Sequence, residues 1–344
     1  MKKACYLFLA LAMAVNLTAC GSTQQESSTE NPESGETQNE VYTLKFAYTI
    51  ADGEPITEVL HQLGENLEEK SGGRIVCEYY PSGELATDAG GFELCAQGSN
   101  VMAFALPSYL TSYVGDIGVV ERPFIFNSME DLITVDTSDW MEGIREELSA
   151  QGIRNLSVGW YFGTRHLTYT GDTPVLTPAD LSKKLMRAAP TATSVKMMEA
   201  MGAKVTTTPW SEIYSALQQG VCDGCEAPLS TLYNSKTYEV CKNISLDGHT
   251  IASWAVCTSE TFFQSLPEDL QQLLIEETQA LAPLAAELVS QGEEEAIALF
   301  KDAGVTIYDD VDVEAFREVC AVFDDSIPGW GEDVYNEIQA IINP

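Results

Sequence analysis

The chain has 344 residues, of which 45% are hydrophobic and 20% are charged, so it carries enough apolar material for more than one average folded domain. Its 52 Asp and Glu residues outnumber 18 Lys and Arg residues and give a net charge of −34. Because a surface this acidic repels nucleic-acid phosphates and anionic lipid headgroups, general nucleic-acid binding is excluded. The high apolar and aromatic content also excludes a disordered acidic chain.

Residues 1–19 have the organisation of a bacterial export signal. Lys2 and Lys3 precede an apolar run that is too short to span a bilayer, and small residues close the run before Cys20. This pattern resembles the lipobox of bacterial lipoproteins, which implies that Cys20 becomes the acylated, palmitate-bearing N-terminus and anchors the protein to the cell membrane. The alternative is an ordinary secretory signal with an incidental cysteine. Residues 20–41 are polar after Cys20 and are predicted to form a flexible tether.

Strand-like and helix-like segments alternate from Tyr42 onward. The segment Tyr42–Tyr48 alternates polar and apolar residues and predicts a strand. Apolar residues at helical spacing from Ile56 to Leu67 predict a helix, and Arg74–Tyr80 predicts a second strand. This alternation indicates an α/β fold with a parallel or mixed sheet. Further strands are predicted at Val101–Leu106, Asn155–Tyr161, Lys184–Ala188, Gly224–Ala227 and Ala252–Thr258.

The C-terminal part is predicted to be mainly helical. Pro267–Lys301 is rich in Leu, Ala, Glu and Gln and predicts one long kinked helix or two helices in succession. A strand at Val305–Tyr308, a helix from about Val313 and a last helix near Glu332–Ile342 follow.

The cysteines do not form a recognisable framework. Seven remain after Cys5 and Cys20 are assigned to the export segment, and an odd number cannot all pair internally. Cys222 and Cys225 have the spacing of redox and zinc sites, but no second such pair or close histidine completes a metal set. Small buried thiols are therefore the preferred interpretation, and a disulfide or redox pair is the alternative.

Catalytic motifs are scarce in this sequence. The three histidines, His61, His166 and His249, have no nucleophile at a diagnostic spacing, and no phosphate-binding loop, zinc-protease motif or nucleophile elbow is present. The acidic run at 309–314 lacks the central glycine of an EF-hand loop, so a solvated turn is favoured over a calcium site. The sequence gives no positive indication of an enzyme, a metal or a cofactor.

Two arginines stand out against this acidic background. Arg187 lies at the end of the predicted strand Lys184–Ala188, where open α/β sheets place their ligands, and Arg165 precedes it by 22 positions. A guanidinium group offers parallel N–H donors that match the two oxygens of a carboxylate. Each arginine could alternatively be a surface residue paired with one of the many acids.

The segments around these arginines resemble a known family. Residues 163–190 and Met201–Leu229 look like the extracytoplasmic solute receptors of tripartite ATP-independent periplasmic (TRAP) transporters, DctP type. Supporting segments occur in the expected order at 69–75, 80–85, 122–126 and 266–270.

The resemblance implies a two-lobed fold like that of periplasmic binding proteins of type II, with a long helix bracing both lobes. Lobe I is expected to comprise 42–163 plus 251–290, and lobe II 164–250 plus 291–344. Such a protein is a receptor without a cofactor and not an enzyme. It binds a small organic acid outside the cytoplasm and delivers it to membrane permease subunits.

The same resemblance assigns residues to the ligand site. Arg187 matches the arginine that binds the ligand carboxylate, Arg165 matches an assisting arginine, and Trp210 matches an aromatic residue that lines the cleft. After Glu226 the family usually has Asn-Pro, but this chain has Ala227-Pro228, and the residues 105–107 are also apolar. Tyr48, Phe162 and Trp254 are further candidates for the cleft, although each aromatic could simply belong to the core. The sequence therefore predicts an acid with an apolar or aromatic body, such as an aryl or branched-chain 2-oxo acid.

Two other functions remain open at this stage. The chain could present its ligand to a sensor instead of a permease, or it could be a secreted enzyme on the same scaffold, because a fold does not fix a function.

Overall fold

The computed structural model describes residues 40–321, 327 and 329–344. The predicted export signal, most of the predicted tether and the predicted lipidation site Cys20 lie outside the described residues. The described residues between 40 and 344 form one compact unit.

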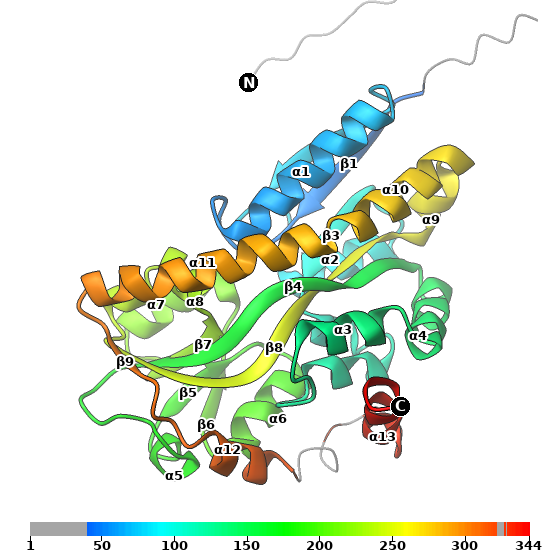
Figure 1. Cartoon of the computed structure of the whole chain (residues 1–344). Helices are drawn as coiled ribbons and strands as arrows, with labels where there is room; N and C mark the ends of the chain where they lie inside the picture. The colour runs from blue at the N-terminus through cyan, green and yellow to red at the C-terminus, as the bar shows by residue number, and fades with distance from the viewer. Residues whose placement is uncertain (1–39, 322–326, 328) are drawn as a thin grey trace, which may run out of the picture. The chain divides into compact units, whose positions relative to one another are not determined.

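One mixed sheet runs through the described unit (Figure 1). Its main strand order is β2-β1-β3-β8-β4-β7-β5-β6, and β9 pairs with β8. The pairs β1/β2, β1/β3, β5/β6, β5/β7 and β8/β9 are parallel, whereas β3/β8, β4/β8 and β4/β7 are antiparallel. The predicted α/β class with a parallel or mixed sheet is therefore confirmed. The strands are β1 (Tyr42–Ala47), β2 (Ile75–Tyr80), β3 (Val101–Ala105), β4 (Ile153–Tyr169), β5 (Leu185–Ala188), β6 (Lys204–Thr207), β7 (Gly224–Pro228), β8 (Asn243–Ser259) and β9 (Thr306–Tyr308).

The two 17-residue strands β4 and β8 connect the two halves of the sheet. The first half contains β1, β2 and β3, and the second contains β5, β6 and β7. The sequence predicted only Asn155–Tyr161 and Ala252–Thr258 of these long strands, because bulges and polar residues interrupt the apolar pattern beyond them. Gly163 sits at such an irregularity with a φ of +127°, where a Cβ would also come within 2.6 Å of the Cβ of Pro228. Strand β4 therefore requires a glycine where it crosses from one half to the other.

Helices cover both faces of the sheet, and α11 joins the two halves (Figure 1). It contacts α1 of the first half, α8 of the second half and β4 between them. Pro267–Lys301 forms two helices in succession, which confirms one of the two sequence alternatives. The helices are α1 (Pro55–Lys70), α2 (Asp88–Ala96), α3 (Met129–Asp136), α4 (Asp139–Ala150), α5 (Pro178–Leu181), α6 (Ala192–Ala200), α7 (Ile213–Gln218), α8 (Leu229–Asn234), α9 (Glu260–Ser265), α10 (Glu268–Ala280), α11 (Ala282–Asp302), α12 (Val313–Cys320) and α13 (Val334–Ile342), and short 3₁₀ helices lie at Pro107–Leu110, Gly115–Glu121, Trp210–Glu212 and Thr237–Glu239.

Each half of the sheet has its own apolar core. Phe46 and Trp160 are buried in the first half, and Met186 and Phe300 are buried in the second. Helix α13 packs against α3 of the first half. The exact lobe boundaries remain predictions.

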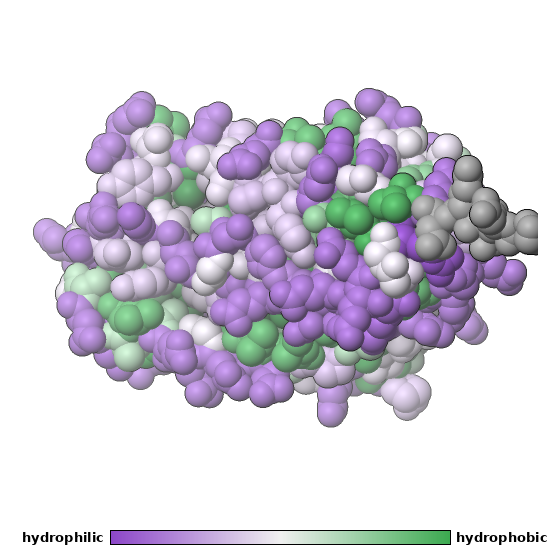
Figure 2. All heavy atoms as spheres, turned by 90° about the horizontal axis from the view of Figure 1, so that it is seen from above, coloured by the Kyte–Doolittle hydropathy of each residue, from purple (hydrophilic) through white to green (hydrophobic). Residues whose placement is uncertain are grey.

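The face that carries α1 and α11 is mostly hydrophilic, with separate apolar areas (Figure 2). This appearance agrees with the excess of acidic residues over basic ones in the sequence. Among the described helices, none combines the length and the apolar character that crossing a membrane requires.

Candidate functional site

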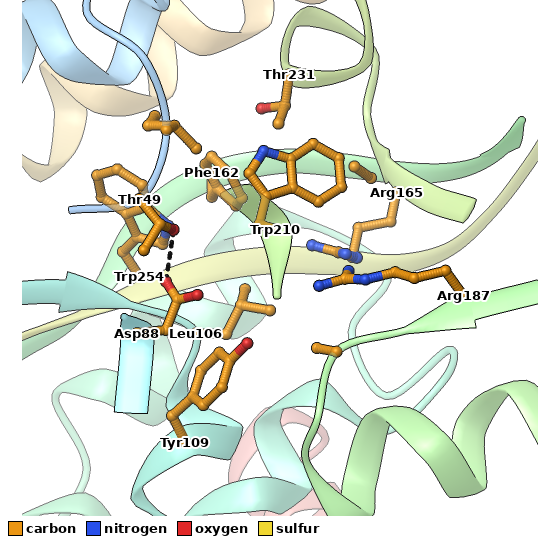
Figure 3. A pocket seen from close by; sticks show the side chains of 13 residues that line it. Thr49, Asp88, Leu106, Tyr109, Phe162, Arg165, Arg187, Trp210, Thr231 and Trp254 are labelled. Carbon is orange, nitrogen blue, oxygen red and sulfur yellow. Dashed lines mark hydrogen bonds between the residues drawn. The ribbon is translucent and has the colours of Figure 1, made fainter. Parts of the chain in front are cut away.

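A cavity lies between the two halves of the sheet (Figure 3). The space in it that the centre of a water-sized sphere can reach is about 40 Å³. Segments that follow β1, β3, β5 and β7 line it, in agreement with the rule that ligands bind at strand ends in α/β sheets. The lining residues are Thr49, Ile50, Asp88, Leu106, Tyr109, Phe162, Arg165, Arg187, Ala189, Trp210, Ala227, Thr231 and Trp254.

Arg187 lines this cavity with a guanidinium group of which only the Nε–H is hydrogen-bonded among the described residues. It is only 2% exposed, and its Nε–H donates to the carbonyl oxygen of Thr208 at 2.8 Å. Its guanidinium carbon lies 5.4 Å from the ring centre of Trp210. No hydrogen bond among the described residues uses its two terminal nitrogens. Buried N–H donors are almost always paired, so this geometry favours an anionic ligand with two acceptor oxygens.

Arg165 also points into the cavity, but its charge is already matched by a carboxylate (Figure 3). Its Nε and Nη2 donate to the two oxygens of Glu226, with Nη2 at 2.8 Å from Oε1. His249 lies between Glu226 and Asp247, with its Nδ1 2.7 Å from Asp247 Oδ2 and its Nε2 3.3 Å from Glu226 Oε2. This buried network fixes the direction of the Arg165 side chain.

The pKa shifts within this network follow from its charges. Burial alone would raise the pKa of Glu226, but the charge of Arg165 and the bonds from His249 and Arg165 outweigh it and lower this pKa to about 2. Burial would lower the pKa of His249, but Asp247 and Glu226 outweigh it and raise the pKa to about 9. Glu226 is therefore ionised and His249 is protonated at neutral pH, so Arg165 contributes little net charge to the cavity.

The opposite wall of the cavity carries a carboxyl group that the sequence did not indicate. Asp88, the first residue of α2, accepts a hydrogen bond from Thr49 Oγ at 2.7 Å (Figure 3). Burial raises the pKa of Asp88, and the bond from Thr49 and the charge of Arg187 oppose that rise. Tyr109 lines the same wall. Burial raises the pKa of its hydroxyl group, which is therefore a neutral phenol. This wall can accept hydrogen bonds from a ligand.

An aromatic wall completes the cavity. Phe162 and Trp254 stack with ring centres 4.9 Å apart, and Trp210 comes from the 3₁₀ helix that follows β6. Phe162 and Trp254 are 6% and 3% exposed and belong to the core cluster as well, so the sequence alternatives of core and cleft both apply to them.

Five of the seven predicted ligand-binding side chains line the cavity, and two do not. Arg187, Arg165, Trp210, Phe162 and Trp254 lie in its wall. Tyr48 is buried in the core with its hydroxyl donating to Asp52, and Glu226 lies behind Arg165. These two residues stand beside the lining residues Thr49 and Ala227.

Some of the lining residues missed by sequence reasoning carried a usable signal. Thr49 and Ala189 directly follow predicted strands, so the strand-end rule would have found them. Asp88 and Tyr109 come from helical segments instead, and no local pattern marks them. The interpretation of 105–107 as an apolar side of the cleft was incomplete, because Asp88 supplies a carboxyl there from another element.

The described part of the chain brings no cluster of metal-ligating side chains to this cavity. Within the ranges that the structure describes, no group of three or more His, Cys, Asp or Glu residues could hold a metal ion. The seven cysteines from Cys77 to Cys320 are buried and free, as the buried-thiol interpretation expected.

The family model DctP, "Bacterial extracellular solute-binding protein, family 7", matches residues 46–325. The chain belongs to the DctP family. A TRAP periplasmic solute-binding protein of Ochrobacterium anthropi, solved with bound L-fuconate, is 32% identical over 88% of this chain and 100% of that chain, with a TM-score of 0.84. A TRAP protein of Actinobacillus succinogenes, solved with bound L-galactonate, is 30% identical over 87% and 99% of the two chains, with a TM-score of 0.83.

Curated relatives agree with this assignment. The C4-dicarboxylate-binding periplasmic protein DctP of Rhodobacter capsulatus is 28% identical over 81% of this chain and 84% of its own length. The DctP family therefore accounts for the two-lobed fold, and the resemblance to TRAP receptors is confirmed. Members of this family are extracytoplasmic receptors that bind solutes for transporters.

Proposed function

We propose that this protein captures a small organic carboxylate outside the cytoplasm and delivers it to the permease subunits of a TRAP transporter. The observation that supports it most directly is the buried Arg187, whose terminal nitrogens have no hydrogen-bond acceptor among the residues that the structure describes. The proposal includes no cofactor and no chemical conversion, because the family consists of solute-binding receptors. Acylated Cys20 would hold the receptor at the cell membrane, through the lipobox-like segment.

Arg187 cannot supply the whole affinity. Two charge-assisted hydrogen bonds contribute about 3–6 kcal/mol, whereas a micromolar complex needs about 8 kcal/mol. At about 25 cal/mol per Å² of apolar surface, the difference corresponds to roughly 80–200 Å² buried on the ligand. Phe162, Trp254 and Trp210 are the aromatic side chains in the cavity wall against which an apolar ligand body would pack. The finer proposal is therefore an acid with an apolar or aromatic body, such as an aryl or branched-chain 2-oxo acid.

A hydroxylated acid is a second candidate ligand, supported by a separate observation. Asp88, Tyr109, Thr49 and Thr231 place polar atoms around the same cavity, and Asp88 interacts with both Thr49 and Tyr109. A carboxylate has more acceptor positions than these two donors use, so a ligand hydroxyl can also donate to it. Related proteins at 30% and 32% identity hold the hydroxylated acids L-galactonate and L-fuconate.

A ligand screen tests the proposal and separates the two ligand classes. Native mass spectrometry of the purified protein first detects any retained acid. Calorimetry then compares phenylpyruvate and 4-methyl-2-oxopentanoate with L-galactonate and L-fuconate. Tight binding of the oxo acids supports the finer proposal, and tight binding of the sugar acids alone rejects it in favour of the second candidate. If native mass spectrometry finds no retained acid and no carboxylate of a broad panel binds in calorimetry, the proposed receptor function is wrong.

A further inference from the structure

One hydrogen bond joins the two halves of the molecule beside the ligand cavity. Thr231 Oγ donates to Glu54 Oε2 at 2.7 Å, across 177 residues of sequence. Glu54 lies just before α1, on the side of β1, and Thr231 lies in α8, directly after β7. Both residues are 2% exposed. The bond therefore connects an element of the first half of the sheet with an element of the second half.

The carboxyl group of Glu54 has no local structural task. Glu54 occupies the N-cap position of α1, but its side chain makes no capping hydrogen bond. Thr57 serves this turn instead, because its hydroxyl donates to the Glu54 carbonyl at 2.7 Å and accepts from Gly53 N–H at 3.1 Å. Thr231 is thus the only hydrogen-bond partner of the Glu54 carboxyl group among the described side chains.

The Glu54 carboxyl group is buried only when the two halves meet, and the bond from Thr231 then offsets part of the cost of that burial. Burial removes its water, and a single hydrogen bond from Thr231 replaces only part of what is lost. Burial also raises the pKa of Glu54 to about 7, against the opposing effect of the Thr231 bond. Separation of the halves would return both groups to water. The pair is therefore sensitive to the distance between the halves.

The pair also lies on the boundary of the ligand cavity. Thr231 lines that cavity, and Glu54 lines an adjoining hollow with about 520 Å³ of empty space. Thr49 and Trp210 line both spaces and separate them. At the outer hollow the halves approach closely, since a methyl group on Gly83 would lie 4.0 Å from the Cβ of Ser211.

We propose that Glu54 and Thr231 form a latch that holds the two halves closed over the ligand cavity. The latch rests on the proposed function only in so far as this cavity is the place where the ligand binds. Both are positioning residues. Thr231 donates the hydrogen bond from the wall of the cavity, and the Glu54 carboxylate accepts it from the other half. Closing the cleft forms the bond, and opening the cleft breaks it.

The test measures the distance between the halves without any ligand. Spin labels are attached through ketone-bearing amino acids at Glu65 of α1 and Gln218 of α7, both exposed, so that the native cysteines stay untouched. Electron-electron resonance then gives the ratio of closed to open molecules. Replacing Thr231 by valine keeps the shape but removes the donor. We expect this Thr231→Val variant to lower the closed-to-open ratio about three- to tenfold, the usual effect of one hydrogen bond.

Matched variants separate a latch from a structural role. Thr231→Ser keeps a hydroxyl and is expected to retain the ratio of the unaltered protein. Glu54→Ala removes the hydrogen bond together with the cost of burying the carboxyl group, so Thr231→Val is expected to cause no further shift in a Glu54→Ala background. An unaltered distance distribution in Thr231→Val, or an equal shift by Thr231→Val with and without the Glu54 carboxyl group, would overturn the latch.

The outcome is independent of the ligand proposal. Arg187→Ala is expected to lose carboxylate binding while Thr231→Val still shifts the distance distribution on that background. If Thr231→Val shifts the distance between the spin labels but the unaltered protein binds no carboxylate, the proposed function is rejected and the latch is kept. If the unaltered protein binds a carboxylate but Thr231→Val leaves the distance between the spin labels unchanged, the latch is rejected and the proposed function is kept.

Discussion

Replacement of Arg187 gives the sharpest test of how the site recognises a carboxylate. In Arg187→Ala the ligand loses both terminal N–H donors, which are worth about 1.5–3 kcal/mol each. The expected loss of about 3–6 kcal/mol corresponds to roughly 10²–10⁴-fold weaker binding, which moves the Kd of a micromolar ligand to about 0.1–10 mM. The fold should persist, because Arg187 lies at the end of the short strand β5 and its side chain donates only to the Thr208 carbonyl among the described residues.

Arg187→Lys separates charge from geometry at the same position. Lysine keeps the positive charge but loses the planar fork and the Nε bond that orients the side chain over Trp210. We expect roughly 10–100-fold weaker binding, equivalent to the loss of about one charge-assisted bond.

Titration calorimetry with the acid found by the screen measures both variants, and circular dichroism checks that they are folded. Lys183→Ala is the matched control, because it also removes one positive charge, four positions away on an exposed side chain. Its affinity should equal that of the unaltered protein. If Arg187→Ala and Arg187→Lys both bind as tightly as Lys183→Ala, the assignment of Arg187 as the carboxylate anchor is wrong.

Three further predictions concern other parts of the chain. Burial raises the pKa of Glu121 to about 7, above its unfolded value of 4.5, so its stabilising contribution is full below pH 4.5 and is lost as pH rises through 7. Thermal melts should show that the stability difference between Glu121→Gln and the unaltered protein changes by up to about 3 kcal/mol over this interval, and a pH-independent difference would contradict the shift. Asp88→Asn should weaken hydroxylated acids about tenfold in calorimetry and leave oxo acids nearly unchanged, whereas equal effects on both would remove its role in selectivity. Cys20→Ser should move the protein from the membrane to the soluble fraction, and continued membrane association would refute lipidation.

Expectations from the sequence succeeded where the signal was local. The apolar periodicities at Tyr42–Tyr48 and from Ile56 to Leu67 correspond to β1 and α1. The position of Arg187 at a predicted strand end placed it in the cavity wall, because parallel strands in α/β sheets open their carboxyl ends toward a common ligand site.

Expectations were incomplete where a contact joins distant residues. Arg165 and Glu226 are 61 positions apart, and their ion pair depends on the register of β4 against β7, in which Arg165 lies opposite Pro228. A diagonal neighbour two residues along the partner strand is within reach of a long side chain. This pairing turns Glu226 into the partner of Arg165, although it had been predicted to bind the ligand.

The sequence by itself therefore determined the α/β class, the family and the arginine that faces the cavity, because strand periodicity, strand ends and short motifs are properties of contiguous residues. Only the tertiary structure decided which charges are neutralised. In the folded chain Arg165 is paired with Glu226, and Asp88 lies opposite Arg187 on a separate helix. Glu54 is hydrogen-bonded to Thr231 across the cleft. The energy of a buried charge depends on its neighbours in space, and those neighbours come from segments far apart in the chain.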